Sequence, residues 1–179
     1  SLLPSRVQPP TWIRANDWNP TDVVATKNAI VHLPSYVSAQ EPYRIASTPT
    51  YFTTSAVDYE FVHPAPDCPR WLKFIGELWP NDPESIQLLQ EWFGYCLTPD
   101  TGHQKIAMLI GPKQSGQGTI ARVLRSLVGD GNVCGPTLAS LQTNFGLWPL
   151  LGKTIAIISD ARLSGRSDQA VITERLLSI

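Results

Sequence analysis

The sequence lacks any uninterrupted run of about 18 apolar residues, the minimum for a membrane-spanning helix. Its opening, SLLPSRVQPP, lacks both the apolar core and the cleavage pattern of a secretory signal. We therefore expect a cytoplasmic protein that makes no contact with membranes. A length of 179 residues, of which 42% are hydrophobic, suits one globular domain or one domain plus part of another.

Cysteine is scarce, and no pair has the C-x-x-C spacing, which excludes a disulfide framework and a thiolate zinc site. The histidines likewise lack the spacing of metal ligands, so we expect them to be structural or surface residues. The three cysteines, expected to be reduced thiols, are Cys68, Cys96 and Cys134.

A large excess of charge is also missing, since the net charge is -1, but the charges are unevenly distributed. Residues 1–100 carry 6 basic and 11 acidic side chains, whereas residues 101–179 carry 8 and 4. Proline and glycine divide at the same place, with 13 of 16 prolines before residue 101 and 10 of 12 glycines after it. We predict two regions, 1–100 and 101–179, and expect phosphate to bind the second.

The first region is predicted to be β-rich and then helical. Residues 1–25 are proline-rich and aperiodic, which predicts an extended arm. Apolar residues favour strands over 28–33 and 51–62, where Val57, Tyr59 and Phe61 alternate with acidic residues. Together these segments predict a small β module.

Two helices are predicted next. Apolar residues at helical spacing begin after Pro69, and Asp82-Pro83-Glu84 gives a second helix an N-cap, a proline at the first position and an acid in the first turn. The aromatic stripe on these helices suggests either a base-stacking surface or core packing, and helical spacing favours the core. Its members are Trp71, Trp79, Trp92 and Phe93.

The second region has the order strand, glycine loop, helix that a phosphate-binding loop requires. Ile106–Ile110 is an apolar run of strand length, and residues 119–127 have helical periodicity. A second buried strand is predicted over 154–159, ending at Asp160. A strand that ends in an acid about 40 residues after the loop is typical of a Walker B segment.

The loop itself reads GPKQSGQGT, and glycine lets its backbone amides approach phosphate oxygens closely. The helix that follows adds unpaired amides and the positive end of its dipole. The hydroxyl of Thr119 is a candidate Mg²⁺ ligand. The predicted ATP-binding residues are Gly111, Pro112, Lys113, Gln114, Ser115, Gly116, Gln117, Gly118 and Thr119.

Two positions depart from the common pattern. Gln117 stands where a phosphate-binding loop has lysine, so neutral amide donors replace a full charge. Lys113 could lean toward the phosphates or remain a solvated surface lysine. Asp160 is a lone carboxylate that could hold Mg²⁺ or orient the attacking water, and we predict it as the catalytic residue without choosing between these roles.

From about Cys68 to Ile179 the chain resembles the phage and plasmid primase-helicases of the P4 type, which contain a superfamily 3 helicase domain. The resemblance rests on IGPKQSGQGTIARVL, NFGLWPLLGKTIAIISDARLSGRSDQ and ERLLSI. It implies an α/β P-loop ATPase of AAA+ type that uses ATP and Mg²⁺ to unwind DNA during replication. It also implies a homo-hexamer, and a helicase domain over residues 101–179 that is incomplete at its C-terminus.

Alternatives remain open. Gln117 also suits a nucleotide-binding or DNA-binding scaffold that has lost hydrolysis, or a decayed prophage product. The G-x-G-T pattern alone would suit a small-molecule kinase, but residues 133–152 resemble no acceptor-binding lid. The first residue is not methionine and the last segment, ITERLLSI, has no helix stop signal, so we expect the chain to be cut at both ends.

Overall fold

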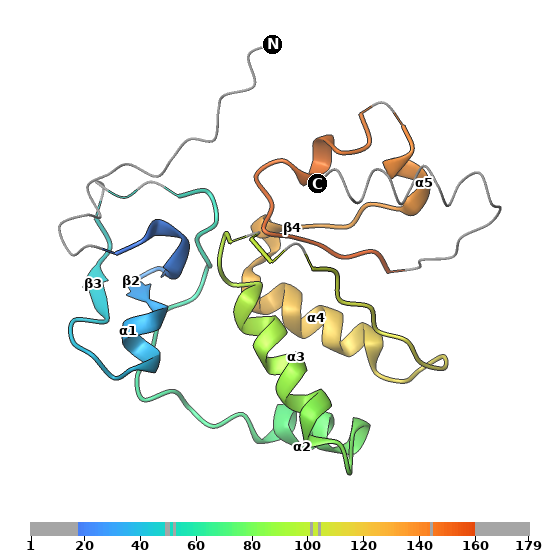
Figure 1. Ribbon diagram of the computed structural model, residues 1–179, viewed down its shortest axis with the longest axis horizontal. Helices are drawn as coiled ribbons and strands as arrows, with labels where there is room; N and C mark the ends of the chain where they lie inside the picture. Colours follow the sequence, from blue (N-terminus) through green and yellow to red (C-terminus); the bar gives the residue numbers. More distant parts are fainter. Residues whose placement is uncertain are drawn as a thin grey trace.

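The protein is of mixed α/β type, with two small sheets and helices that pack between and beside them (Figure 1). The computed structural model describes residues 18–48, 51, 53–100, 102–103, 105–143 and 145–159. In chain order the helices and strands are β1 (Val23–Ala25), β2 (Ala29–His32), α1 (Leu33–Val37), β3 (Arg44–Ala46), α2 (Pro69–Leu78), α3 (Pro83–Tyr95), α4 (Gln117–Val128), β4 (Val133–Cys134), α5 (Leu138–Leu141) and β5 (Ile155–Ala156).

The first sheet is antiparallel, in the order β1-β2-β3, with Ile30 opposite Ala25 on one side and Ile45 on the other. Trp18 is buried and stacks on His32, with 4.9 Å between the ring centroids. The predicted extended arm is therefore wrong for residues 18–25, because an aromatic anchor and three strand residues fix them to the sheet. Residues 1–17 lie outside the described part of the chain.

The predicted strand over 51–62 is not formed by the described residues of that segment. Two isolated hydrogen bonds join this segment to the end of β1 and the turn after it. The Val57 amide donates to the Ala25 carbonyl at 2.9 Å, and the Tyr59 carbonyl accepts from the Lys27 amide at 3.0 Å. The alternation of burial predicted for this segment is nevertheless present, with Val57 only 4% exposed between exposed neighbours. Alternating side chains were enough to place one face inward, but not to make a continuous ladder.

The predicted start of α3 is confirmed. Pro83 is the first helical residue, and the Asp82 carboxylate accepts hydrogen bonds from the amide and the hydroxyl of Ser85, at 3.0 and 2.6 Å. The hydroxyl bond and then the amide bond lower the pKa of the Asp82 carboxyl. A local cap of this kind depends on neighbouring residues only, so the sequence was sufficient to predict it.

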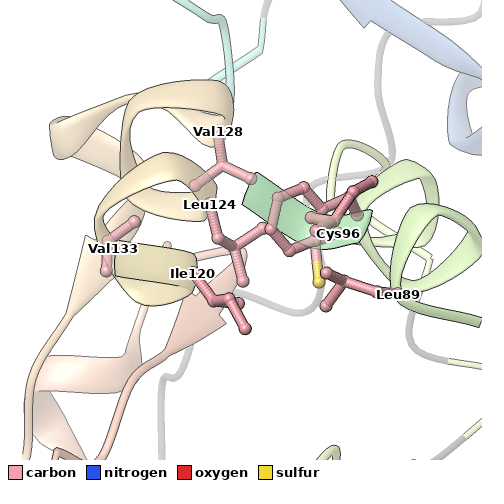
Figure 2. Packing of buried hydrophobic residues seen from close by; sticks show 8 residues of the cluster. Leu89, Cys96, Ile120, Leu124, Val128 and Val133 are labelled. Carbon is pink, nitrogen blue, oxygen red and sulfur yellow. The ribbon is translucent and has the colours of Figure 1, made fainter. Parts of the chain in front are cut away.

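The main hydrophobic core lies among α2, α3, α4 and β4 (Figures 1 and 2). In Figure 2, side chains from α4 point toward Leu89 of α3 and toward Cys96, which follows that helix. The aromatic stripe packs against this cluster, as the sequence indicated. The buried members are Ile75, Leu89, Phe93, Cys96, Ile120, Leu124, Val128 and Val133, so the core draws on both sides of the division predicted after residue 100. The division of the chain into the regions 1–100 and 101–179 therefore stays a prediction.

Asn132 connects this core to the β module. Asn132 is only 3% exposed, and its side-chain Nδ2 donates to the Val128 carbonyl at 2.7 Å and to the Ala56 carbonyl at 3.0 Å. The second bond joins residues that are 76 positions apart. Because a buried amide without partners is costly, these bonds fix the module against the end of α4.

The second sheet is parallel and contains β4 and β5, with Val133 opposite Ile155. The strand predicted over 154–159 is thus present only as the two residues Ile155–Ala156. The strand predicted over 106–110 is wrong: these residues form no strand, and Ile106, Met108 and Ile110 are 70–87% exposed. An apolar run becomes a strand only beside a partner, and no described segment pairs with it.

None of the helices in the described part of the chain has the length and the apolar character that a membrane-spanning helix needs.

Candidate phosphate-binding site

The glycine loop runs from Gly111 to Gly116 and leads directly into α4. Gly116 is the residue before the helix and has a φ of +85°, in the left-handed region that side chains disfavour. Gln114 also has a positive φ, of 65°. Two left-handed residues within three positions turn the chain sharply, so the loop folds back over the first turn of the helix.

Glycine is favoured by space at positions 111 and 116, and at 116 by backbone conformation as well. A Cβ at Gly111 would lie 2.6 Å from Ser115 Oγ, which is closer than real contacts allow. A Cβ at Gly116 would lie 3.0 Å from both Phe74 Cζ and Leu78 Cδ2 of α2. The loop is therefore compact on the inside and closed on the side that faces α2.

The first amides of α4 are free to bind a ligand. The amides of Thr119 and Ile120 donate to the Gly116 carbonyl, at 2.9 and 3.0 Å, whereas those of Gln117 and Gly118 donate to no backbone acceptor in the described part of the chain. Gly118 is exposed, and a Cβ placed there would meet nothing within 4 Å. Unpaired amides at the positive end of a 12-residue helix make a favourable environment for an anion.

The local charge is also suited to an anion. Between Asp100 and Asp130 the sequence contains no acidic residue, but it contains four basic ones: Lys105, Lys113, Arg122 and Arg125. Lys113 is exposed within the loop and forms no ion pair with any described residue. Arg125 is directed elsewhere, since it lies 3.4 Å from Asp130.

Gln117 does not extend toward the open side of the loop. Its side-chain Nε2 donates to the Leu109 carbonyl at 3.1 Å, eight residues earlier in the chain. The bond ties the first turn of α4 to the segment that enters the loop, and it occupies one of the two N–H donors of the side-chain amide. The sequence located Gln117 at the departure from the common pattern, but it could not predict this contact.

Thr119 lies in the first turn of α4, where the sequence placed a Mg²⁺ ligand. Its Oγ1 accepts a hydrogen bond from Arg122 Nη2 at 3.1 Å. Arg122 thus brings a positive charge to the edge of the loop, which is a role that sequence reasoning did not assign. The spacing of three residues on one helix face was the available signal.

The remaining predicted site residue, Asp160, lies outside the described residues. Within the described ranges, no group of three or more His, Cys, Asp or Glu side chains could hold a metal ion. Thr119 is therefore the one predicted Mg²⁺ ligand that lies among the described residues.

The cysteines form no disulfide. All three are free thiols, and burial raises the pKa of Cys96 to about 11. Burial is also the main cause of the raised pKa of Cys134. Both shifts favour the neutral thiol, which suits packing and not nucleophilic chemistry.

No protein-family model matches the chain, and a search of the curated proteins finds no match.

Proposed function

We propose that the loop binds the phosphates of ATP, and that the chain is part of an ATP-dependent DNA helicase of the superfamily 3 type. The observation that carries the proposal is the left-handed turn at Gly116, which leads into α4 and leaves the amides of Gln117 and Gly118 without a described backbone acceptor. Phosphate oxygens are strong acceptors, and a helix start of this form suits them.

The residues of the loop fit a phosphate group, since a side chain on Gly111 or Gly116 would fill or distort the turn. The Thr119 hydroxyl would hold Mg²⁺, together with Asp160. The ion would neutralise charge on the phosphates and align them. The Thr119 hydroxyl oxygen has two lone pairs, so it could accept from Arg122 with one and face the ion with the other. The Arg122 guanidinium would add positive charge at the same edge of the loop.

A second candidate is favoured by the Gln117 contact. A helicase loop uses a charged side chain at this position to stabilise the transferring phosphoryl group. Here the side chain is neutral and already bonded to the Leu109 carbonyl. A scaffold that binds ATP or DNA without hydrolysing ATP is consistent with that arrangement.

Titration of the chain with ATP, with and without Mg²⁺, tests phosphate binding directly. We expect saturable binding that inorganic triphosphate displaces. Gly116→Ala should abolish it, because the turn cannot accept a Cβ. Gly94→Ala is the matched control, since it makes the same change in α3 where nothing lies within 4 Å. Absence of saturable binding by the unchanged chain would refute the proposal.

Hydrolysis and assembly separate the two candidates. The helicase proposal implies release of phosphate that DNA stimulates, and a homo-hexamer formed by the full-length protein around DNA. The scaffold proposal implies ATP binding with no release above that of Gly116→Ala. Phosphate release and sedimentation, each measured with and without single-stranded DNA, distinguish these outcomes.

A further inference from the structure

Helix α2 packs against the loop at Gly116. The two nearest side chains are Phe74 and Leu78, whose terminal carbons are each 3.0 Å from the position that a Cβ on Gly116 would occupy. Both side chains are partly buried and pack against the main core. The left-handed residue of the loop therefore lies against an apolar surface that comes from a helix almost forty positions earlier in the chain.

This surface is itself held firmly. Ile75, between the two contacting residues, is only 1% exposed and anchors α2 in the core. Trp71 lies 5.7 Å from Phe74 and stacks on Phe93 of α3 at 5.6 Å, measured between ring centroids. A continuous set of packed rings thus connects α3 to the loop.

We infer that Phe74 and Leu78 are positioning residues of the phosphate loop: they hold Gly116 in its left-handed turn and so direct the amides of Gln117 and Gly118 toward the ligand. The inference rests on the proposed phosphate binding for its functional meaning. Its structural content does not, because it concerns the conformation of the loop before any ligand arrives. A glycine without such support samples many conformations, and each one misdirects the amides.

Hydrogen exchange of the unliganded full chain tests the structural content. Leu78→Ala should speed exchange of the Ser115, Thr119 and Ile120 amides by at least about fivefold, because these amides donate to carbonyls of the loop and the loop loses an apolar contact. Exchange in the core of α3 should stay within about twofold. Leu72→Ala is the matched control, since it removes the same atoms from the same helix at a side chain that is 51% exposed. Equal exchange of the three loop-bonded amides in both variants would overturn the inference.

Titration with MgATP and with inorganic triphosphate tests the functional content. Leu78→Ala should weaken both by the same factor, at least about fivefold, because the loop contacts phosphate and not the base. Leu78→Met, which restores an apolar contact of similar volume, should bind within about twofold of the unchanged chain. Failure of the unchanged chain to bind either probe would refute the proposed function. Binding that Leu78→Ala leaves unaltered would refute the positioning role alone.

Loss of folding in Leu78→Ala is detected separately by thermal unfolding, and Phe74→Leu is then the variant to measure. This substitution removes the ring that contacts Gly116 but keeps an apolar residue against Trp71. Faster exchange of the Ser115, Thr119 and Ile120 amides in Phe74→Leu supports the inference, and exchange equal to that of the unchanged chain contradicts it.

Discussion

Replacing Gln117 by lysine should restore the charge that the loop lacks. In the structure the glutamine amide is bonded to the Leu109 carbonyl, at 3.1 Å, and so it contributes little to ligand affinity if that bond persists. A lysine ammonium that reaches a phosphate makes a charge-assisted hydrogen bond worth about 1.5–3 kcal/mol. Ordering the lysine side chain costs about 0.5–1.5 kcal/mol. The difference between the midpoints is about 1.3 kcal/mol, so Gln117→Lys should bind ATP roughly eightfold more tightly.

Equilibrium titration with ATP at fixed salt measures this change, and Gln114→Lys is the matched control. It adds the same charge to the same loop, at an exposed residue whose φ of 65° is already left-handed for a non-glycine side chain. A gain shared equally by both variants would mean that general attraction, and not the position of residue 117, controls affinity. Affinity of Gln117→Lys equal to that of the unchanged chain would refute the reasoning.

Three further predictions concern the rest of the chain. Asn132→Ala should lower the free energy of unfolding by about 2–4 kcal/mol, because the buried Val128 carbonyl and the partly buried Ala56 carbonyl lose their donor. Asn28→Ala, which removes two exposed bonds with the Phe61 backbone and one with the Thr26 hydroxyl, should cost less, and urea unfolding that ranks the two variants in reverse would contradict this. Hydrogen bonds from Ser85, in the first turn of α3, lower the pKa of the Asp82 carboxyl. The stabilisation by this carboxylate is therefore present above about pH 4 and is lost as the pH falls through the lowered pKa. Between about pH 5 and 2 the melting temperature of Asp82→Asn should drop less than that of the unchanged chain. Because burial raises the pKa of Cys96 to about 11, its alkylation at pH 8 should be at least about a hundredfold slower than that of exposed Cys68, and comparable rates by peptide mass spectrometry would rule this out.

Local signals in the sequence predicted local structure well. The cap at Asp82 depends on residues within one turn, and it is present. The predicted glycine loop turns tightly at Gly116, whose left-handed φ few other residues tolerate. The order of loop and helix was likewise readable, since helical periodicity continues without a break from residue 119.

Features that depend on distant partners were not predicted. Ile106–Ile110 has the composition of a buried strand, but composition does not say which segment would lie beside it. The contact of Gln117 with Leu109 depends on how the loop folds back, and the contact of Leu78 with Gly116 depends on how α2 packs. Each joins residues whose spacing carries no periodic signal.

The distribution of the core has a practical consequence for a chain cut within the loop region. Its buried side chains come from α2 and α3 on one side of residues 97–116 and from α4 and β4 on the other. A single cut between Gly102 and Lys113, where the described chain is exposed, would leave two pieces that still share one apolar surface. The pieces should remain associated after proteolysis and reassemble when mixed, so that the β module together with α2 and α3 complements the piece that begins with the loop.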